Sequence, residues 1–123
     1  MTATPFGPIR QIAWVVRDLE ASVQSWLRIS GVGPWTCFRN VALSGRHHGV
    51  DTRVRMHVAL GYQDGMEIEL IEDLGAGSSP YRGPAGEPLV GMHHVAWFSE
   101  DVAADAARDW RGEDPVRVID LGG

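Results

Sequence analysis

Hydrophobic residues follow two different periods along the first half of the chain. Residues 9–16 are rich in apolar and β-branched side chains, which predicts a strand. Apolar residues then recur at helical spacing, at Leu19, Val23, Trp26 and Leu27. Asp18 is well suited to cap the first turn of this helix, and Gly31, followed by Gly33-Pro34, predicts its end.

Three more strands are expected before residue 75. They are predicted at residues 35–43, 53–62 and 66–72, with a tight turn at Gln63-Asp64-Gly65 between the last two. Residues 45–51, which include His47 and His48, are expected to form a loop. Residues 75–91 are rich in Gly, Ser and Pro, which is typical of a linker. The first unit is therefore predicted to be a β-α-β-β-β module.

The chain also contains an internal repeat. Residues 10–21 read RQIAWVVRDLEA and residues 93–104 read HHVAWFSEDVAA, so the second copy follows the first by 83 positions. Four residues recur unchanged, since Ala13, Trp14, Asp18 and Ala21 return as Ala96, Trp97, Asp101 and Ala104. The repeat predicts a second strand at 92–98, a helix at 101–111 and a further strand at 116–121. We expect one domain over residues 1–123, with module one at about 8–74 and a partial module two at 92–123.

Alternation along each strand predicts which side chains share a face of the sheet. In the strand at 66–72, Glu67 and Glu69 lie opposite Ile68 and Leu70. The apolar faces are expected to pack on the helix, and in the strand at 53–62 this face carries Val54, Met56, Val58 and Leu60. The first strand turns Gln11 away from the helix, and the repeat carries the same inward position over to His94. The polar face then collects Gln11, Arg53, Arg55, His57, Glu67, Glu69 and His94.

Two interpretations of this polar face stay open. Gln, Glu and His on adjoining strands are competent nitrogen and oxygen ligands for a divalent metal ion. A sheet face with Arg, Glu and His can also simply be solvated, with Arg53 and Arg55 paired to Glu67 and Glu69 across strands. Alternation alone favours the solvated face.

Several of these segments resemble the vicinal-oxygen-chelate superfamily, which includes glyoxalases, bleomycin-resistance proteins and methylmalonyl-CoA epimerases. The matching segments are IRQIAWVVRDLEAS with GVGPW, then GYQDGMEIELIE, then SSPYR followed by GMHHVAWF. The resemblance covers about residues 8–110. It implies an α+β fold in which paired β-α-β-β-β modules form a cup-shaped mixed sheet, with the second module incomplete in this chain.

The resemblance also implies a metal site. Metal ligands in this family come from the first and last strands of each module, which selects Gln11, Glu69 and His94 here. The ion would be Zn, Ni, Co, Mn or Mg. A fourth ligand is due one repeat beyond Glu69, near position 152, whereas the sequence ends at Gly123. Three explanations fit this gap: a truncated chain, a partner subunit that completes the sheet and the site, or a protein that kept binding and lost catalysis. We expect a homodimer, because a sheet that lacks two strands exposes unpaired edges.

Two functions follow from the resemblance. The first is a metal-dependent lyase, isomerase or epimerase that abstracts a proton next to a carbonyl of a small chelating substrate. Glu69 is the first candidate for the base and Glu67 the second, while Arg55 and His57 could hold an anionic group. The alternative is a metal-free small-molecule binding protein of the bleomycin-resistance kind. Trp14, Trp35 and Trp97 are its candidate aromatic surface, although Trp14 and Trp97 fit the core better. An extradiol dioxygenase fits less well, because Gln11 occupies a position where its iron site needs a histidine.

Composition limits the expected partners and location of the protein. The net charge is −5, which argues against a nucleic-acid partner because such a surface needs clustered Lys and Arg. The single cysteine excludes an intramolecular disulfide and fits a reducing compartment. No apolar run approaches the roughly 18 residues of a membrane span, and no signal peptide is visible at the N-terminus. We therefore expect a cytoplasmic protein with no membrane partner.

Overall fold

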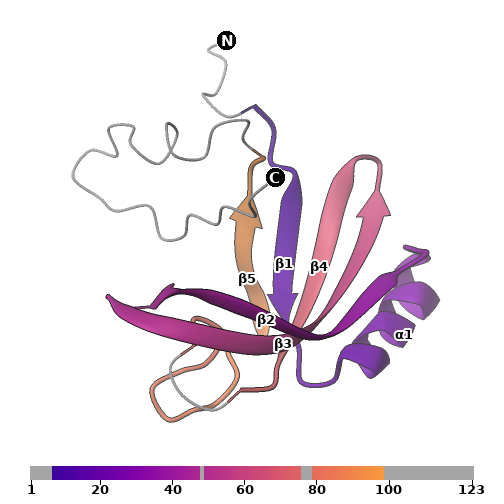
Figure 1. The fold of residues 1–123 in the computed structure, drawn as a ribbon. Helices are drawn as coiled ribbons and strands as arrows, with labels where there is room; N and C mark the ends of the chain where they lie inside the picture. The colour runs from indigo at the N-terminus through magenta and orange to yellow at the C-terminus, as the bar shows by residue number, and fades with distance from the viewer. Residues whose placement is uncertain (1–6, 48, 76–78, 99–123) are drawn as a thin grey trace. The chain divides into compact units, whose positions relative to one another are not determined.

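The structure is a computed structural model that describes residues 7–47, 49–75 and 79–98. The described residues form one helix and five strands, in the order β1 (Gln11–Val15), α1 (Leu19–Ser30), β2 (Thr36–His47), β3 (Val50–Gln63), β4 (Met66–Asp73) and β5 (Gly91–Ala96). Figure 1 shows these elements on the ribbon. The contacts divide the chain into Ile9–Ala96, which holds all of these elements, and a unit of Met1–Pro8 with Trp97–Gly123. The helix and strand expected after residue 100 lie outside the described residues.

The strands form a single open sheet in the order β2-β3-β4-β1-β5. β1 and β4 are parallel, while the other three neighbouring pairs are antiparallel. This mixed sheet with one helix confirms the α+β fold class. The arrangement corresponds to one β-α-β-β-β module together with the first strand of the next. No helix among the described residues is long and apolar enough to cross a membrane.

Local chemistry explains where α1 begins and ends. The Asp18 carboxylate accepts a hydrogen bond from the backbone N–H of Ala21 at 3.0 Å, and the Glu72 carboxylate accepts one from Leu19 at 2.8 Å. These bonds satisfy N–H groups that the first helical turn cannot pair internally. Gly31 ends the helix in the left-handed conformation at φ 73°, as the sequence predicts. Because Glu72 lies in β4, its bond also ties the start of the helix to the sheet.

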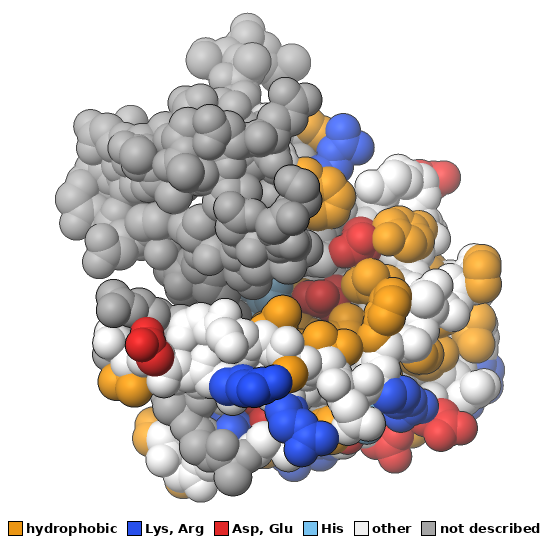
Figure 2. All heavy atoms as spheres, viewed as in Figure 1, with side chains coloured by type: hydrophobic (Ala, Val, Ile, Leu, Met, Phe, Trp, Pro, Cys, Tyr) orange, Lys and Arg blue, Asp and Glu red, His pale blue; other side chains and the backbone are white. Residues whose placement is uncertain are grey.

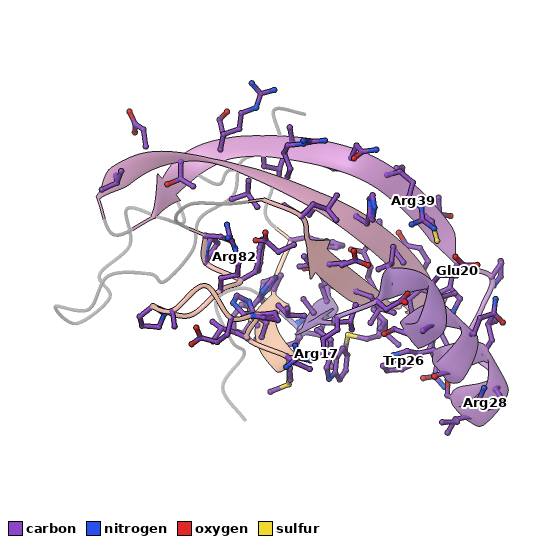
Figure 3. All side chains as sticks on the ribbon, turned by 90° about the horizontal axis from the view of Figure 1, so that it is seen from below. Arg17, Glu20, Trp26, Arg28, Arg39 and Arg82 are labelled. Carbon is purple, nitrogen blue, oxygen red and sulfur yellow. The ribbon has the colours of Figure 1, made fainter. Side chains whose placement is uncertain are left out.

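One sheet face, called the helix face here, packs against α1. Its buried residues are Leu19, Val23, Val32, Ala59, Ile68 and Leu70. Three tryptophans pack around them: Trp14, Trp26 and Trp35. The ring centroid of Trp26 lies 5.2 Å from that of Trp14 and 5.9 Å from that of Trp35. In Figure 3 the Trp26 side chain lies on the sheet side of the helix, whereas Arg28 points away. Trp14 and Trp35 therefore pack under the helix and do not lie on the polar face of the sheet.

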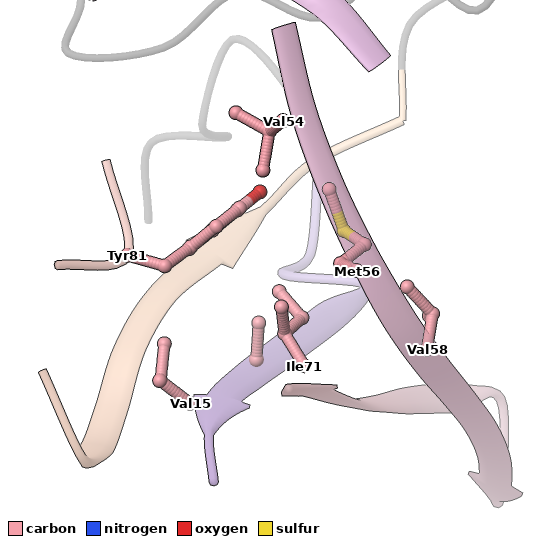
Figure 4. Packing of buried hydrophobic residues seen from close by; sticks show 7 residues of the cluster. Val15, Val54, Met56, Val58, Ile71 and Tyr81 are labelled. Atoms are coloured by element: carbon pink, nitrogen blue, oxygen red, sulfur yellow. The ribbon is translucent and has the colours of Figure 1, made fainter. Parts of the chain in front are cut away.

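The opposite face, called the inner face, has its own apolar cluster. It contains Ala13, Val15, Val54, Met56, Val58, Ile71 and Tyr81. Figure 4 shows Tyr81, which comes from the segment before β5, lying among the aliphatic side chains of β1, β3 and β4. This cluster corrects the prediction that Val54, Met56 and Val58 pack on the helix, because they lie on the same face as Ile71. Leu60 packs against the same cluster.

The β2–β3 hairpin is longer than the sequence suggests. Residues 45–47 and 50–51, expected in a loop, belong to the two strands, and their pairing continues to His47 opposite Val50. The register of β2 shifts between Phe38 and Val41, where Asn40 adopts a positive φ of 54°. An extra residue in one strand breaks the ladder locally and bends it. This bulge is where Arg55 and His57 make their contacts.

Candidate functional site

Two of the predicted site residues meet on the inner face. Ala13 of β1 is paired with Glu69 of β4 on one side and with His94 of β5 on the other. Ala13 is fully buried and carries only a methyl group, so the two longer side chains approach each other across it. The His94 Nε2 atom lies 3.8 Å from the Glu69 Oε1 atom. Both side chains keep partial access to solvent, at 18% for His94 and 20% for Glu69.

Gln11 lies one pair further along the same face, opposite Glu67. Its Nε2 atom donates a hydrogen bond to Glu67 Oε1 at 2.5 Å. The Tyr62 hydroxyl donates to the second oxygen of Glu67 at 2.7 Å. Both oxygens of Glu67 thus accept a hydrogen bond from a neighbouring side chain. The structure thus directs the Gln11 amide nitrogen to Glu67 and not to the Glu69–His94 pair.

The environment of Glu69 favours its protonated form. Burial is the larger cause and the negative charge of Glu67 the smaller, and together they raise the pKa of Glu69 from 4.5 to about 7. The hydrogen bond to Glu67 raises the pKa of the Tyr62 hydroxyl, which fits its role as a donor. The two carboxyl groups, two residues apart on one strand, therefore have different surroundings: Glu67 accepts hydrogen bonds from Gln11 and Tyr62, and Glu69 lies beside His94.

His94 is in contact with its neighbour in the chain. The register of β5 shifts between Ala13 and Trp14, so that Ala13 lies opposite His94 and Trp14 opposite Met92. The Nδ1 atoms of His93 and His94 lie 2.8 Å apart, and the ring of His93 lies 5.1 Å from that of Tyr81. The shift therefore brings both imidazoles to the inner face, where strict alternation would have separated them. In Figure 2 a pale blue histidine surface borders red acidic and orange hydrophobic side chains.

Arg55 and His57 lie elsewhere. His57 is paired with Glu72 and Leu60 with Glu69, so the odd-numbered residues of this part of β3 are on the helix face. The Nδ1 atom of His57 accepts a hydrogen bond from the Asn40 backbone at 3.1 Å, and Arg55 donates to the Asn40 side chain at 3.2 Å. These contacts hold the bulge of β2. The expectation that Arg55 and His57 share a face with Glu69 is wrong, because the register of β3 turns them away.

A hollow of about 540 Å³ lies near the far end of the β2–β3 hairpin. Ser44, Gly45, Asp51, Thr52 and Arg53 line it. None of the predicted metal or catalytic residues contributes to it, and the chemistry of Glu69 and His94 lies on another part of the sheet. We therefore place the candidate site at the Glu69–His94 pair.

Comparison with known proteins identifies the family of the chain. Residues 10–120 match the family model of the glyoxalase/bleomycin resistance protein/dioxygenase superfamily. The chain belongs to this superfamily. A search of curated proteins found no relative that matches. The glyoxalase superfamily contains both metal-dependent and metal-free proteins. Whether this chain has a metal site must therefore be argued from its own residues.

The donor chemistry of the pair fits a divalent cation. Two protein donors that each bind one ion at about 2.1 Å lie roughly 3 to 4 Å from each other. The distance of 3.8 Å between His94 Nε2 and Glu69 Oε1 falls in this range. Within the described part of the chain, no group of three His, Cys, Asp or Glu residues is placed to hold a metal.

Sequence reasoning missed three contributors to this site. Tyr62 was not singled out, although its place opposite Glu67 follows once the turn at Asp64-Gly65 fixes the β3–β4 register. The small size of Ala13, which recurs in the repeat as Ala96, is a signal that could have been used. His93 precedes His94 directly, so alternation predicts that it faces the other way, and no pattern in the sequence predicts the register shift that brings it to the inner face.

Proposed function

We propose that this chain is a metal-dependent enzyme that moves a proton next to a carbonyl group of a small substrate. The observation that supports this is the approach of Glu69 and His94 on one sheet face, beside the hydrogen-bonded carboxylate of Glu67. Glu69, His94 and Gln11 would hold the cation. A bound divalent ion would act as a Lewis acid toward the oxygen on which negative charge develops.

Glu69 is the proton-transfer residue in this proposal. Its carboxylate takes the proton as the C–H bond beside the carbonyl breaks, and the electron pair passes into the enolate. Return of the proton to the other face or to a neighbouring carbon gives an epimer or an isomer. A pKa of about 7 suits both steps, because the group is then close to half ionised near neutral pH.

Glu67 has a different role. Both of its oxygens accept hydrogen bonds, from Gln11 and Tyr62, so it is less available as a base. Its charge disfavours ionisation of Glu69, and its bond to Gln11 fixes the orientation of that amide. Because the Gln11 nitrogen donates to Glu67, the amide oxygen is the atom left to face a cation.

We further propose that the protein works as a homodimer that acts on a small molecule. β5 is an edge of the sheet formed by the described residues, and edge strands offer backbone groups that pair with another chain. Met92 and Val95 on this strand are 66% and 36% exposed. A second copy along β5 would lie next to His94 and could supply a further donor to the site.

Metal analysis of the purified chain and its variants tests the proposed site. Equilibrium dialysis against Zn²⁺, Ni²⁺, Co²⁺, Mn²⁺ and Mg²⁺ should show binding that Glu69→Ala and His94→Ala remove and Gln11→Ala weakens. His57→Ala is the matched control, because this histidine lies on the helix face and should leave binding unchanged. Equal metal content in all three site variants would refute the site. A change of tryptophan fluorescence with a small ligand that resists chelators would instead indicate the metal-free binding protein.

A further inference from the structure

The imidazole of His93 takes part in two short contacts whose chemistry can be worked out. Its Nε2 atom lies 2.8 Å from the carbonyl oxygen of Pro80, and its Nδ1 atom lies 2.8 Å from Nδ1 of His94. A carbonyl oxygen can only accept, so the Nε2 atom of His93 must carry the hydrogen. In a neutral ring the Nδ1 atom of His93 is then an acceptor.

The position of the hydrogen on His93 determines the position of the hydrogen on His94. The contact between the two Nδ1 atoms needs one hydrogen, and His93 in its neutral form has none at that atom. The hydrogen therefore belongs to Nδ1 of His94. Its Nε2 atom, which lies 3.8 Å from Glu69 Oε1, then carries the lone pair.

We infer that His93 is a positioning residue that fixes His94 in the Nδ1–H tautomer and directs the Nε2 lone pair toward Glu69. The Pro80 carbonyl, His93 and His94 form a chain of hydrogen bonds, called the relay here. Because the Pro80 carbonyl can only accept, it determines which atom is the donor in each bond of the relay. A histidine that binds a metal commonly donates its other ring N–H to a neighbouring acceptor, which orients the ring and raises its basicity. Here the acceptor is a second histidine.

The Pro80 carbonyl is itself held in place. The Asp73 side chain is only 1% exposed and lies 3.2 Å from Arg82 Nε, and it accepts a hydrogen bond from the Ser79 hydroxyl at 2.5 Å. Ser79 in turn accepts from the Tyr81 backbone at 3.1 Å, and the Tyr81 ring is buried in the inner cluster. Residues on both sides of Pro80 are thus anchored to the end of β4. Figure 4 shows the Tyr81 ring reaching toward Val54.

The tautomer can be tested in the metal-free protein, independently of the proposed function. Histidine labelled with ¹⁵N, measured at pH 8.5 in the presence of a chelator, reports which ring nitrogen carries the proton through long-range ¹H–¹⁵N correlations. We expect His94 to be protonated at Nδ1. His93→Phe keeps a ring against Tyr81 but removes both nitrogens, so His94 should become a mixture of tautomers. His93→Gln retains an acceptor and should restore the Nδ1–H form.

A wild-type His94 protonated at Nε2 would overturn the inference, and so would a His94 tautomer that does not change in His93→Phe. Circular dichroism and the unfolding midpoint check that each variant is folded. If His93→Phe does not fold, Asp73→Asn, which loosens the Pro80 carbonyl and leaves both imidazoles in place, serves as the second variant. Its His94 should also lose the single tautomer.

The effect of His93 on metal binding rests on the proposed function. A Zn²⁺ titration distinguishes failure of the proposed metal site from failure of the inferred tautomer. We expect His93→Phe to weaken Zn²⁺ binding by about 10- to 100-fold, with partial recovery in His93→Gln. If wild type binds no Zn²⁺ while the tautomer depends on His93, the metal site fails and the relay stands. If Zn²⁺ binds wild type and His93→Phe equally, the relay has no bearing on the site and the inference fails.

Discussion

The protonated state of Glu69 predicts an unusual dependence of stability on pH. The pKa is about 7 in the folded chain against 4.5 for an unperturbed glutamate. A raised carboxyl pKa means that the folded state holds the proton longer than the unfolded state, so stability is lost as pH rises from about 4.5 to 7. At 1.36 kcal/mol per pKa unit, the full loss above pH 8 is about 3 kcal/mol.

Substitution of Glu69 by glutamine isolates this effect. Glutamine is neutral at every pH and nearly the same size, so the two proteins should be equally stable near pH 4, below both pKa values of Glu69. At pH 8 the variant should be more stable by about 3 kcal/mol. Urea unfolding at intervals of one pH unit, followed by tryptophan fluorescence with a chelator present, measures the difference. With a slope of about 1.5 to 2 kcal/mol/M the midpoints should separate by about 1.5 to 2 M at pH 8.

Two comparisons show whether the stated causes are right. Glu20→Gln, on the exposed first turn of α1, should leave the pH dependence of wild type unchanged. Glu67→Gln removes the like charge but not the burial, so the loss of stability should move to lower pH without disappearing. The reasoning is refuted if wild type and Glu69→Gln lose stability in parallel between pH 5 and 8.

Three further outcomes are expected. Asp73→Ala should lower the free energy of unfolding by about 3 kcal/mol, measured by urea unfolding, because it leaves the Arg82 side chain without its buried partner; a loss below about 1 kcal/mol would count against this. Ala13→Val should destabilise the fold by about 1 to 3 kcal/mol and abolish Zn²⁺ binding in dialysis, because added methyl groups between Glu69 and His94 overpack a fully buried position. Native mass spectrometry should show a dimer, and Val95→Lys on the β5 edge should shift it toward monomer; a wild-type monomer at all concentrations would contradict the proposed assembly.

The parts of the fold that were predictable depend on local chemistry. Asp18 and Gly31 marked the ends of α1 because capping needs particular side chains at those places. The faces of β1 and β4 followed from alternation, since each strand has one apolar face against the helix and one that carries Gln11 or Glu69. The same information placed Glu69 and His94 on one face, because His94 is the repeat counterpart of Gln11 and alternation turns Glu69 to the side that Gln11 occupies. In the structure β1 lies between their two strands.

The face of β3 was not predictable by the same rule, because both of its faces are buried. On the helix face, Ala59 is fully buried and a Cβ on Gly61 would lie 2.9 Å from the Trp35 ring. Small residues are needed there because a tryptophan covers them, so the helix face does not look hydrophobic in the sequence. The larger apolar residues of β3 fill the inner face around Tyr81. Hydrophobicity alone therefore assigned Arg55 and His57 to the wrong side.

The placement of Glu69 is best understood from its neighbours on the same strand. Ile71 occupies the next inward position of β4 and is 1% exposed, which shows what packing alone favours on this face. Glu69 instead sets a carboxyl group beside Glu67, and among the described residues no Lys or Arg forms an ion pair with either. Its ionised form destabilises the folded chain, so Glu69 contributes nothing to holding the sheet together at neutral pH. A cation between Glu69 and His94 would reverse that sign, since it favours the ionised carboxylate and the histidine lone pair at once. The loss of stability at high pH and the proposed metal binding thus both depend on the ionised Glu69 carboxylate. Glu69→Gln should therefore abolish both.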